Sequence, residues 1–340
     1  MKKHAIIPIF IPHNGCNNDC VFCNQKIITA RSKSPDTQDV IDIIEKHLTT
    51  IDKNKIETIE VAFYGGSFTG LDISLQNKYL EVAKKYKLDG KIHKIHLSTR
   101  PDYVDETILV NLKKYYVDII ELGVQSFDKD VLTASKRGHS VEDVYRACEL
   151  IKNYGFTLGI QLMIGLPKDN FEKSIFSANQ LVQLKPAIAR LYPTMVLPDT
   201  ELLEMLNNGT YVPLSEDKVL NITKEMYKII DDADIQIIRV GLKSTDLIND
   251  YNIKAGNYHP AFRQIVESAI ALERIDSQIS NIILNNFNVS ELKIYSNSKH
   301  ISSAVGHKKS NKNHLENKYP NIKFRFLRDE MLRDNDYRIE

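Results

Sequence analysis

Three things that this sequence lacks narrow the class of protein. It has almost no net charge, 45 Lys and Arg against 44 Asp and Glu, so any nucleic acid or membrane partner must be held by a local patch. No apolar run reaches the length of a membrane span. The apolar stretch 5–11 is short, holds a proline and lacks a small-residue cleavage site, which argues against a secretory signal. We therefore expect a cytoplasmic protein with no membrane partner.

Cysteine is also scarce, and its four residues are unevenly spread. Cys16, Cys20 and Cys23 fall within eight residues, whereas Cys148 stands alone. A disulfide framework needs dispersed cysteines in a secreted chain, so this pattern excludes one. A tight group of thiols in a cytoplasmic protein indicates a metal site instead.

Short β-rich apolar runs alternate with helical patterns along the first 240 residues. Helices are predicted over 37–51 and over 139–154, where Ser140 is the expected N-cap and Cys148 lies on the apolar face as a core residue. This alternation predicts βαβ units, a parallel sheet and a partial or closed β/α (TIM-like) barrel in the α/β class. The predicted strands are 5–11, 59–64, 93–98, 117–124, 156–164, 187–192 and 235–241.

Cysteine, glycine, proline or polar residues follow nearly every predicted strand. In β/α barrels the active site lies at the carboxyl ends of the strands, so these segments are expected to converge on one mouth. His93 and His96, near the third strand, are expected to serve packing or the surface rather than ligation. The segments at the strand ends are 16–23, 64–70, 98–102, 125–126, 165–167 and 193–194.

The thiol group predicts a particular chemistry. Three thiolates at this spacing can hold three irons of a [4Fe-4S] cubane and leave the fourth iron without a protein ligand. An open iron can chelate the amino and carboxylate groups of S-adenosylmethionine (SAM), and one electron then cleaves SAM to a 5′-deoxyadenosyl radical. The alternative is structural zinc held by His13, Cys16, Cys20 and Cys23.

The motif Cys-x3-Cys-x2-Cys, with Phe22 before its last cysteine, resembles the signature of the radical SAM superfamily. Within that superfamily the chain is similar to the radical SAM part of the Elongator catalytic subunit, which modifies wobble uridine in tRNA. A more distant similarity, through 123–127 and 165–167, is to oxygen-independent coproporphyrinogen oxidase. The segments that resemble the Elongator subunit are 12–16, 64–69, 98–102, 121–126, 137–139 and 191–194.

The resemblance implies a role for particular residues. Cys16, Cys20 and Cys23 would hold the [4Fe-4S] cluster. Arg137 would pair with the methionine carboxylate of SAM, a bidentate geometry that suits arginine. The remaining residues implied to contact SAM are Phe10 and Phe22 at the adenine side and cluster loop, Gly65, Gly66 and Ser67 at the methionine amino group, Ser98 at the ribose or methionine end, and Gln125 and Gln161 at the ribose hydroxyls.

The last part of the chain has a different composition. We expect a radical SAM barrel over 1–245 and, over 246–340, a C-terminal extension with a small basic α/β module. The segment 296–328 holds eight Lys or Arg against one acid, with Tyr319, Phe324 and Phe326 interleaved, and could dock tRNA through lysine–phosphate contacts. The Elongator subunit also carries a C-terminal acetyltransferase domain that handles acetyl-CoA. No Gly-rich acyl-CoA loop follows the last predicted strand here, so we do not expect this chain to carry out the complete carboxymethylation of the wobble uridine.

Two further expectations concern partners and alternatives. The chemistry requires an electron donor of the flavodoxin or ferredoxin type. A haem- or cofactor-trafficking protein that retains the cluster, and a zinc-stabilised binding module without catalysis, are the competing hypotheses. Metal content and 5′-deoxyadenosine formation distinguish among the three.

Overall fold

The computed structural model describes residues 4–12, 15–16, 18–29, 33–52, 54–242, 252–285 and 289–340. The chain divides into two compact units, one of 1–222 with 229–258 and the other of 223–228 with 259–340. None of the described helices has the length and apolar character that a membrane span requires.

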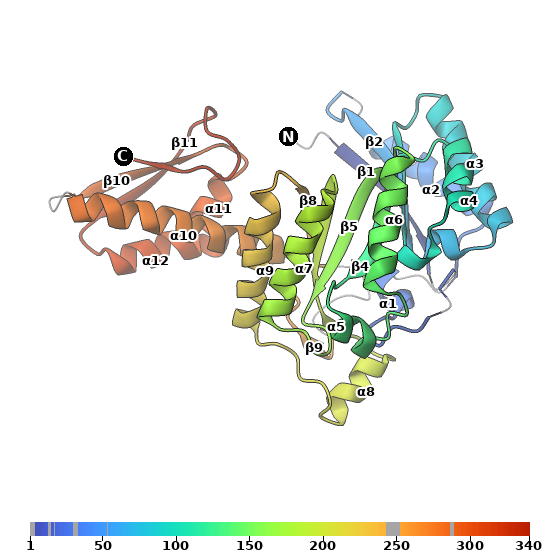
Figure 1. The fold of residues 1–340 in the computed structure, drawn as a ribbon. Coiled ribbons are helices and arrows are strands. Elements are labelled where there is room, and N and C mark those ends of the chain that lie inside the picture. Colours follow the sequence, from blue (N-terminus) through green and yellow to red (C-terminus); the bar gives the residue numbers. More distant parts are fainter. Residues whose placement is uncertain are drawn as a thin grey trace. The chain divides into compact units, whose positions relative to one another are not determined.

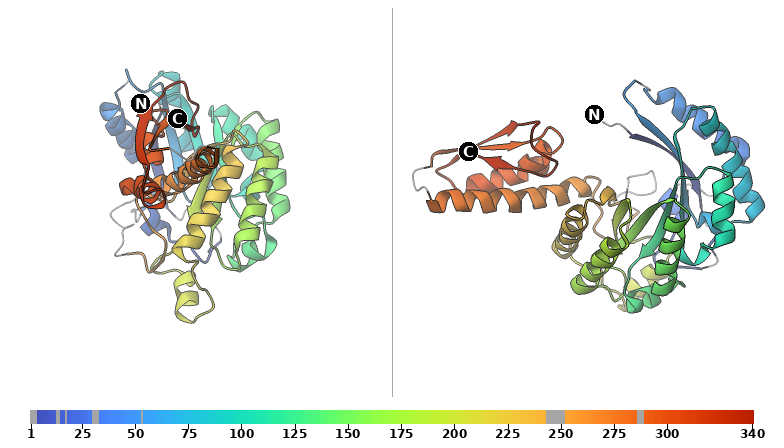
Figure 2. Two further views of the ribbon diagram at one scale, coloured as in Figure 1. Left: turned by 90° about the vertical axis from the view of Figure 1, so that its left-hand side faces the viewer. Right: turned by 45° about the horizontal axis from the view of Figure 1, so that its top comes forward.

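The first unit is built on a seven-stranded parallel sheet that curls into a half-barrel (Figures 1 and 2). Its strands run in the order β1-β2-β3-β4-β5-β6-β8, so most neighbours in the sheet are also consecutive along the chain. All seven lie within two residues of the predicted ranges, and the predicted fold class is confirmed. The strands are β1 (His4–Ile11), β2 (Thr58–Gly65), β3 (Lys94–Thr99), β4 (Ile119–Gln125), β5 (Thr157–Ile164), β6 (Ile188–Pro193) and β8 (Gln236–Val240).

Helices connect these strands and cover the outer face of the sheet (Figure 1). Asp36 and Asp39 form a capping box at the start of α2, and Ser140 and Asp143 do the same at α6, as the N-cap prediction for Ser140 required. Cys148 is fully buried on α6, which confirms its assignment to the core. The helices of this unit are α1 (Gln25–Thr29), α2 (Thr37–Thr50), α3 (Ile73–Leu88), α4 (Glu106–Lys114), α5 (Lys129–Ala134), α6 (Val141–Asn153), α7 (Phe171–Leu184), α8 (Glu201–Asn207) and α9 (Glu216–Asp231), the last shared with the second unit.

The carboxyl ends of the strands carry short additional elements. A 3-10 turn, Phe68–Gly70, follows β2, and another, Pro101–Tyr103, follows β3. Beyond β6, the two-residue strand β7 (Met195–Val196) pairs in antiparallel fashion with β9 (Ala255–Gly256). The segments that follow the strands therefore gather at one edge of the sheet, where the candidate site lies.

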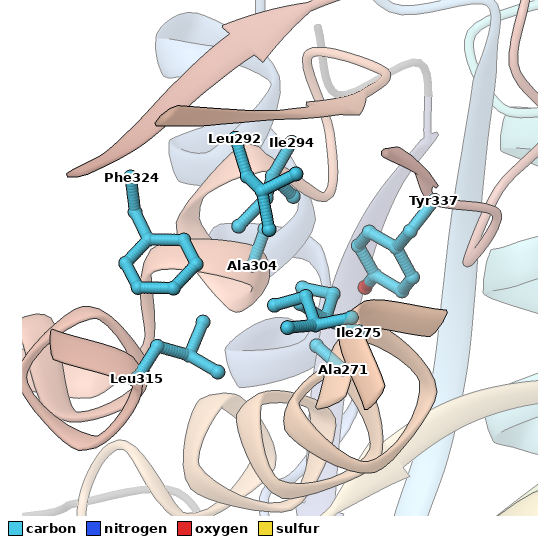
Figure 3. Packing of buried hydrophobic residues seen from close by; sticks show 9 residues of the cluster. Ala271, Ile275, Leu292, Ile294, Ala304, Leu315, Phe324 and Tyr337 are labelled. Atoms are coloured by element: carbon cyan, nitrogen blue, oxygen red, sulfur yellow. The ribbon is translucent and has the colours of Figure 1, made fainter. Parts of the chain in front are cut away.

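The second unit has its own sheet and core. The strands β10 (Glu291–Ser296) and β11 (Lys323–Arg328) are parallel neighbours, and β12 (Arg338–Ile339) runs antiparallel to β10. Helices α10 (Phe262–Asn285), α11 (Ile301–Val305) and α12 (Ser310–Lys318) complete this unit. Figure 3 shows the core that these elements enclose, made of Ala271, Ile275, Leu292, Ile294, Ala304, Leu315, Phe324 and Tyr337, with Ile279.

Candidate active site

The three clustered cysteines lie together in the loop between β1 and α1, which we call the cysteine loop. Cys20 is buried and Cys16 and Cys23 are half-buried. Burial, followed by the proximity of Cys20 and Cys16, raises the pKa of the Cys23 thiol to about 12. The three thiols therefore lie close enough together to form a single sulfur-lined site. Its donor chemistry suits an iron–sulfur cluster, because coordination to iron replaces the thiol proton and offsets the cost of gathering three thiolates.

Glycines allow the backbone of the cysteine loop to pack directly against the end of β2. Gly15 has a φ of +77°, and a Cβ added there would lie 2.1 Å from the carbonyl oxygen of Ser67. A Cβ on Gly70 would lie 2.0 Å from the carbonyl oxygen of Gly15. No side chain fits between these two backbones, so the spacing between the loop and the strand end requires glycine at both positions.

Residues 65–67, assigned to the methionine amino group, border the cysteine loop. Gly65 has a φ of +112°, and its backbone passes so close to Ile11 that a Cβ would lie 2.7 Å from the Ile11 oxygen. The Gly66 N–H donates to the same oxygen at 2.8 Å. Ser67, which is buried, places its hydroxyl 3.3 Å from the Cys16 sulfur. The end of β2 therefore supplies both a tight turn and a polar contact to the first thiol.

Arg137 lies at the second thiol. Its Nη1 donates to the Cys20 sulfur at 3.1 Å, and its Nη2 donates to the carbonyl oxygen of Gly123 on β4. The residue is only 6% exposed, which rules out a solvated loop charge. Arg137 therefore ties the second thiol to the end of β4. Its Nε has no hydrogen-bond partner among the described residues.

The loop that carries Arg137 also braces the cysteine loop. The Val21 N–H donates to the Ser135 oxygen at 3.2 Å, and the Asn18 amide donates to the Lys136 oxygen. Gly138 has a φ of +76°, and a Cβ there would lie 2.7 Å from Asn18. This bracing role is not predicted from the sequence. Its signal is the run of turn residues that follows α5 directly.

The two glutamines assigned to the ribose lie side by side. Gln161 on β5 donates through its Nε2 to Gln125 Oε1 at 3.1 Å. Gln125 has a φ of +72° and ends β4 at an irregularity in the β4–β5 register, which follows Gly123. A left-handed residue at a strand end is uncommon outside glycine and marks a backbone shaped for a particular purpose.

The remaining predicted residues occupy separate places around the mouth. Phe10, half-buried on β1, has its ring centroid 6.3 Å from that of Tyr64. Phe22 packs against an apolar cluster that includes Val21 and Leu202 and so ties the cysteine loop to α8. Ser98 on β3 donates to Glu121 at 3.3 Å.

His13, the fourth ligand of the zinc alternative, lies outside the described residues. Across the described parts of the chain, no three His, Cys, Asp or Glu side chains are placed to hold a single metal ion. A cluster ligated through separate irons does not require the thiols to meet at one point.

Behind the mouth, the concave face of the sheet carries a buried charged network. Arg190 on β6 lies 2.8 Å from Glu121 on β4 through its Nε, and its Nη2 donates to the Tyr64 hydroxyl at 2.6 Å. β2 and β6 are not neighbours in the sheet, so the contact between Tyr64 and Arg190 can form only across the concave side. Burial alone would lower the pKa of Arg190, but attraction to Glu121 together with the Tyr192 and Tyr64 hydroxyls outweighs burial and raises it, so the guanidinium stays charged.

Glu60 and His96 continue this network. His96 Nδ1 lies 2.6 Å from Glu60 Oε1, and its Nε2 lies 3.7 Å from Glu121 Oε2. Burial alone would raise the pKa of Glu60, but hydrogen bonds from His4 and His96 outweigh burial and lower it to about 2. Glu60 is therefore ionised at neutral pH. The sequence does not predict this network, although Glu60, Glu121 and Arg190 are charged residues inside largely apolar strands, which is a recognisable signal.

Comparison with known proteins agrees with this geometry. The family model of the radical SAM superfamily matches residues 10–176, and that of the radical SAM C-terminal domain matches residues 186–271. The tRNA uridine(34) acetyltransferase of Methanocaldococcus infernus is 32% identical over 189 residues, which cover 49% of this chain and 35% of that protein. Elongator complex protein 3 of Homo sapiens is 30% identical over 139 residues, which cover 40% of this chain and 25% of that protein.

A solved structure shares the fold. The archaeal Elp3 of Methanocaldococcus infernus, with an N-terminal deletion, has a TM-score of 0.64 and 22% identity over 80% of this chain and 64% of that chain. This chain spans about a third of the length of the archaeal acetyltransferase that it matches. The two family matches together span most of the chain: the first covers the cysteine loop and β2 to β5, and the second runs from β6 into the first turns of α10. The chain belongs to the radical SAM superfamily of enzymes.

Proposed function

We propose that this chain holds a [4Fe-4S] cluster on Cys16, Cys20 and Cys23, binds SAM at the mouth of the half-barrel and modifies an RNA, with tRNA as the preferred class. The observation that carries the proposal is the proximity of three thiols in the loop after β1, while Cys148, the remaining cysteine, is buried on α6. When bound, the cluster supplies the electron that cleaves SAM and yields a 5′-deoxyadenosyl radical.

The protein's own residues would prepare the ligands. Arg137 donates a hydrogen bond to the Cys20 sulfur at 3.1 Å. Ser67 and Gln25 offer hydrogen-bonding groups to the Cys16 sulfur, at 3.3 Å and 3.8 Å. Hydrogen bonds to ligand sulfurs tune the electronic properties of the centre, so we assign these three residues to that role.

SAM would lie across the carboxyl ends of β2 to β5. Gly65 and Gly66 would let its amino group approach the backbone, Ser67 and Ser98 would provide hydroxyls, and Gln125 with Gln161 would bind the ribose. Phe10 and Phe22 would border the adenine and the cluster loop. The methionine carboxylate would be met by Arg137, whose Nε has no other hydrogen-bond partner in the described residues.

The substrate assignment rests on the relatives and on charge. Two of the relatives are named for tRNA uridine(34) or for Elongator. In the second unit, Phe324 is buried in the core and Tyr319 and Phe326 pack against it, so these rings do not face an RNA. Within 296–328, Lys308 and Lys309 are exposed and pair with no acidic side chain of the described residues, so they are the candidates for phosphate contacts. The acetyl transfer of the relatives is not part of the proposal, because the chain spans only about a third of their length.

The test is anaerobic reconstitution of the full chain with iron and sulfide, followed by reduction with a flavodoxin- or ferredoxin-type donor and assay of 5′-deoxyadenosine. Wild type should carry about four irons per chain and form 5′-deoxyadenosine. Cys23→Ala should lose the cluster and the product. Cys148→Ala is the matched control, because it deletes a buried thiol outside the mouth and should retain both.

Three outcomes would overturn the proposal. One zinc per chain with no sulfide would indicate a zinc-stabilised module. An intact cluster that forms no 5′-deoxyadenosine, with or without tRNA, would favour cofactor trafficking, for which haem titration is the direct assay. Equal loss of iron in Cys23→Ala and Cys148→Ala would show that the effect comes from general unfolding.

A further inference from the structure

The second unit contains a strand–helix–helix–strand arrangement that the sequence analysis does not predict. β10 and β11 are parallel neighbours, paired from Glu291 opposite Lys323 to Ser296 opposite Arg328. The chain passes between them through α11 and α12, which pack with the shared core (Figure 3). The two helices are joined by a tight connection, Gly306–Lys309, which we call the basic loop.

The basic loop has an unusual backbone with three positive φ angles, and its two lysine side chains are exposed. Gly306 has a φ of +86°, and the next two lysines, Lys308 and Lys309, have φ values of +52° and +65°. A Cβ on Gly306 would lie 2.4 Å from the Asn311 nitrogen, so glycine is required there. The Lys309 N–H donates to the Gly306 oxygen at 2.9 Å, which closes the turn. Both lysine side chains are exposed.

Neighbouring residues anchor the basic loop to α10. The His307 N–H donates to the Ser268 hydroxyl at 3.2 Å, and His307 Nδ1 lies 3.3 Å from Gln264 Oε1. The amide of buried Asn311 donates to the Ser268 oxygen at 2.7 Å and to the Ser303 oxygen at 3.0 Å. Little conformational freedom remains in the loop backbone, so a ligand would bind it without a large ordering cost.

The charges of the basic loop differ from most others in the unit. Lys299 pairs with Asp334 at 3.0 Å, Lys318 pairs with Asp276 at 2.6 Å, and Arg325 pairs with Glu291. Lys308 and Lys309 pair with no acidic side chain of the described residues, and they are adjacent. The unit thus neutralises many of its cations and leaves two together on a rigid turn between two helices.

We propose that the basic loop binds successive phosphates of an unpaired RNA strand. In KH modules, a glycine loop between two helices of a strand–helix–helix–strand unit clamps the backbone of single-stranded nucleic acid. Gly306 occupies the first glycine position of such a loop. Lys309 occupies the last position and adopts the left-handed conformation that a glycine would favour there. The inference rests on the proposed RNA substrate and identifies which part of 296–328 meets it.

The test uses the full chain and a fluorescently labelled single-stranded RNA, with duplex RNA of the same sequence as comparison. Lys308→Asp with Lys309→Asp reverses both charges with a residue that tolerates left-handed φ, so folding should persist. We expect at least about tenfold weaker binding, and a salt dependence shallower by about 1.4 in log–log slope for two lost phosphate contacts. Lys308→Asn with Lys309→Asn should show the same trend more weakly.

The matched control is Lys323→Asp with Arg328→Asp, an equal change of charge at exposed β11 residues that have no acidic partner among the described residues. It should reduce affinity by no more than about twofold, because long-range attraction is screened by salt. Equal losses in the loop and control variants, or tighter binding of duplex than of single strand, would overturn the proposal. Binding is measured without SAM or reductant, so this result is independent of SAM cleavage.

Discussion

The curled sheet buries its charges, whereas the C-terminal unit exposes them. Glu60, His96 and Glu121 are each no more than 2% exposed and are held by partners from other strands. Lys299 and Asp334 form their pair with more than half of each side chain in solvent. A buried charge must be matched by a partner in one geometry, whereas an exposed pair exchanges readily with water or with a ligand. The first arrangement suits a rigid reaction chamber, and the second suits an interaction surface.

The largest expected effect tests the close packing of the cysteine loop on the end of β2. Gly15→Ala should abolish most iron retention, because a Cβ would collide with the Ser67 oxygen at 2.1 Å. Gly90→Ala is the matched control, since Gly90 also has a positive φ but has nothing within 4 Å of the added carbon. The measurement is iron per chain after anaerobic reconstitution. If both variants kept the cluster equally well, the close packing of the cysteine loop on β2 would not matter for its assembly.

A second prediction tests the cost of breaking a buried ion pair. Arg190→Met leaves Glu121 uncompensated at 2% exposure and should lower the free energy of unfolding by about 3–5 kcal/mol. Arg325→Met removes the exposed pair with Glu291 and should cost about 1 kcal/mol or less. Chemical denaturation followed by circular dichroism measures both. Equal losses would remove the contrast between the two regions.

The pH dependence of stability gives a third prediction. The pKa of Glu60 falls from 4.5 unfolded to about 2 folded, so its stabilisation is present above about pH 4.5 and is lost as the pH falls toward 2. That loss should amount to about 3 kcal/mol in wild type and should be absent in Glu60→Gln. Asp334→Asn, at an exposed pair, should leave the pH profile close to wild type. Parallel profiles for wild type and Glu60→Gln would contradict the network.

The smallest effect concerns a single hydrogen bond at the mouth. Gln161→Leu should weaken SAM binding by about tenfold, the equivalent of one net hydrogen bond, while iron content is unchanged. Gln236→Leu changes an exposed residue at the opposite, amino end of β8 and should bind SAM as wild type does. Equilibrium binding of SAM to the reconstituted protein provides the measurement. Unchanged affinity in Gln161→Leu would remove this residue from the proposed ribose site.

The seven strands of the parallel sheet show how much of the fold can be predicted from the periodicity of apolar residues. The predicted bounds of the seven strands agree with the observed bounds to within two residues, because local patterns of apolar residues and turns decide where strands begin and end. Cys148 was placed correctly in the core for the same reason. The contact of Arg190 with Tyr64 was not foreseen, since it depends on how far the sheet curls and joins residues 126 positions apart. Composition likewise identified 296–328 as basic, but could not show which cations pair with acids.

The sequence by itself determined the grouping of three thiols and the order of strands and helices, because closely spaced cysteines and a repeating apolar pattern are properties of neighbouring residues. Only the tertiary structure decided which polar residues face one another behind the mouth, that Arg137 meets Cys20, and that Lys308 and Lys309 remain without acidic partners among the described residues. Those outcomes depend on contacts between distant segments, and burial then sets whether each charge is paired or left to solvent.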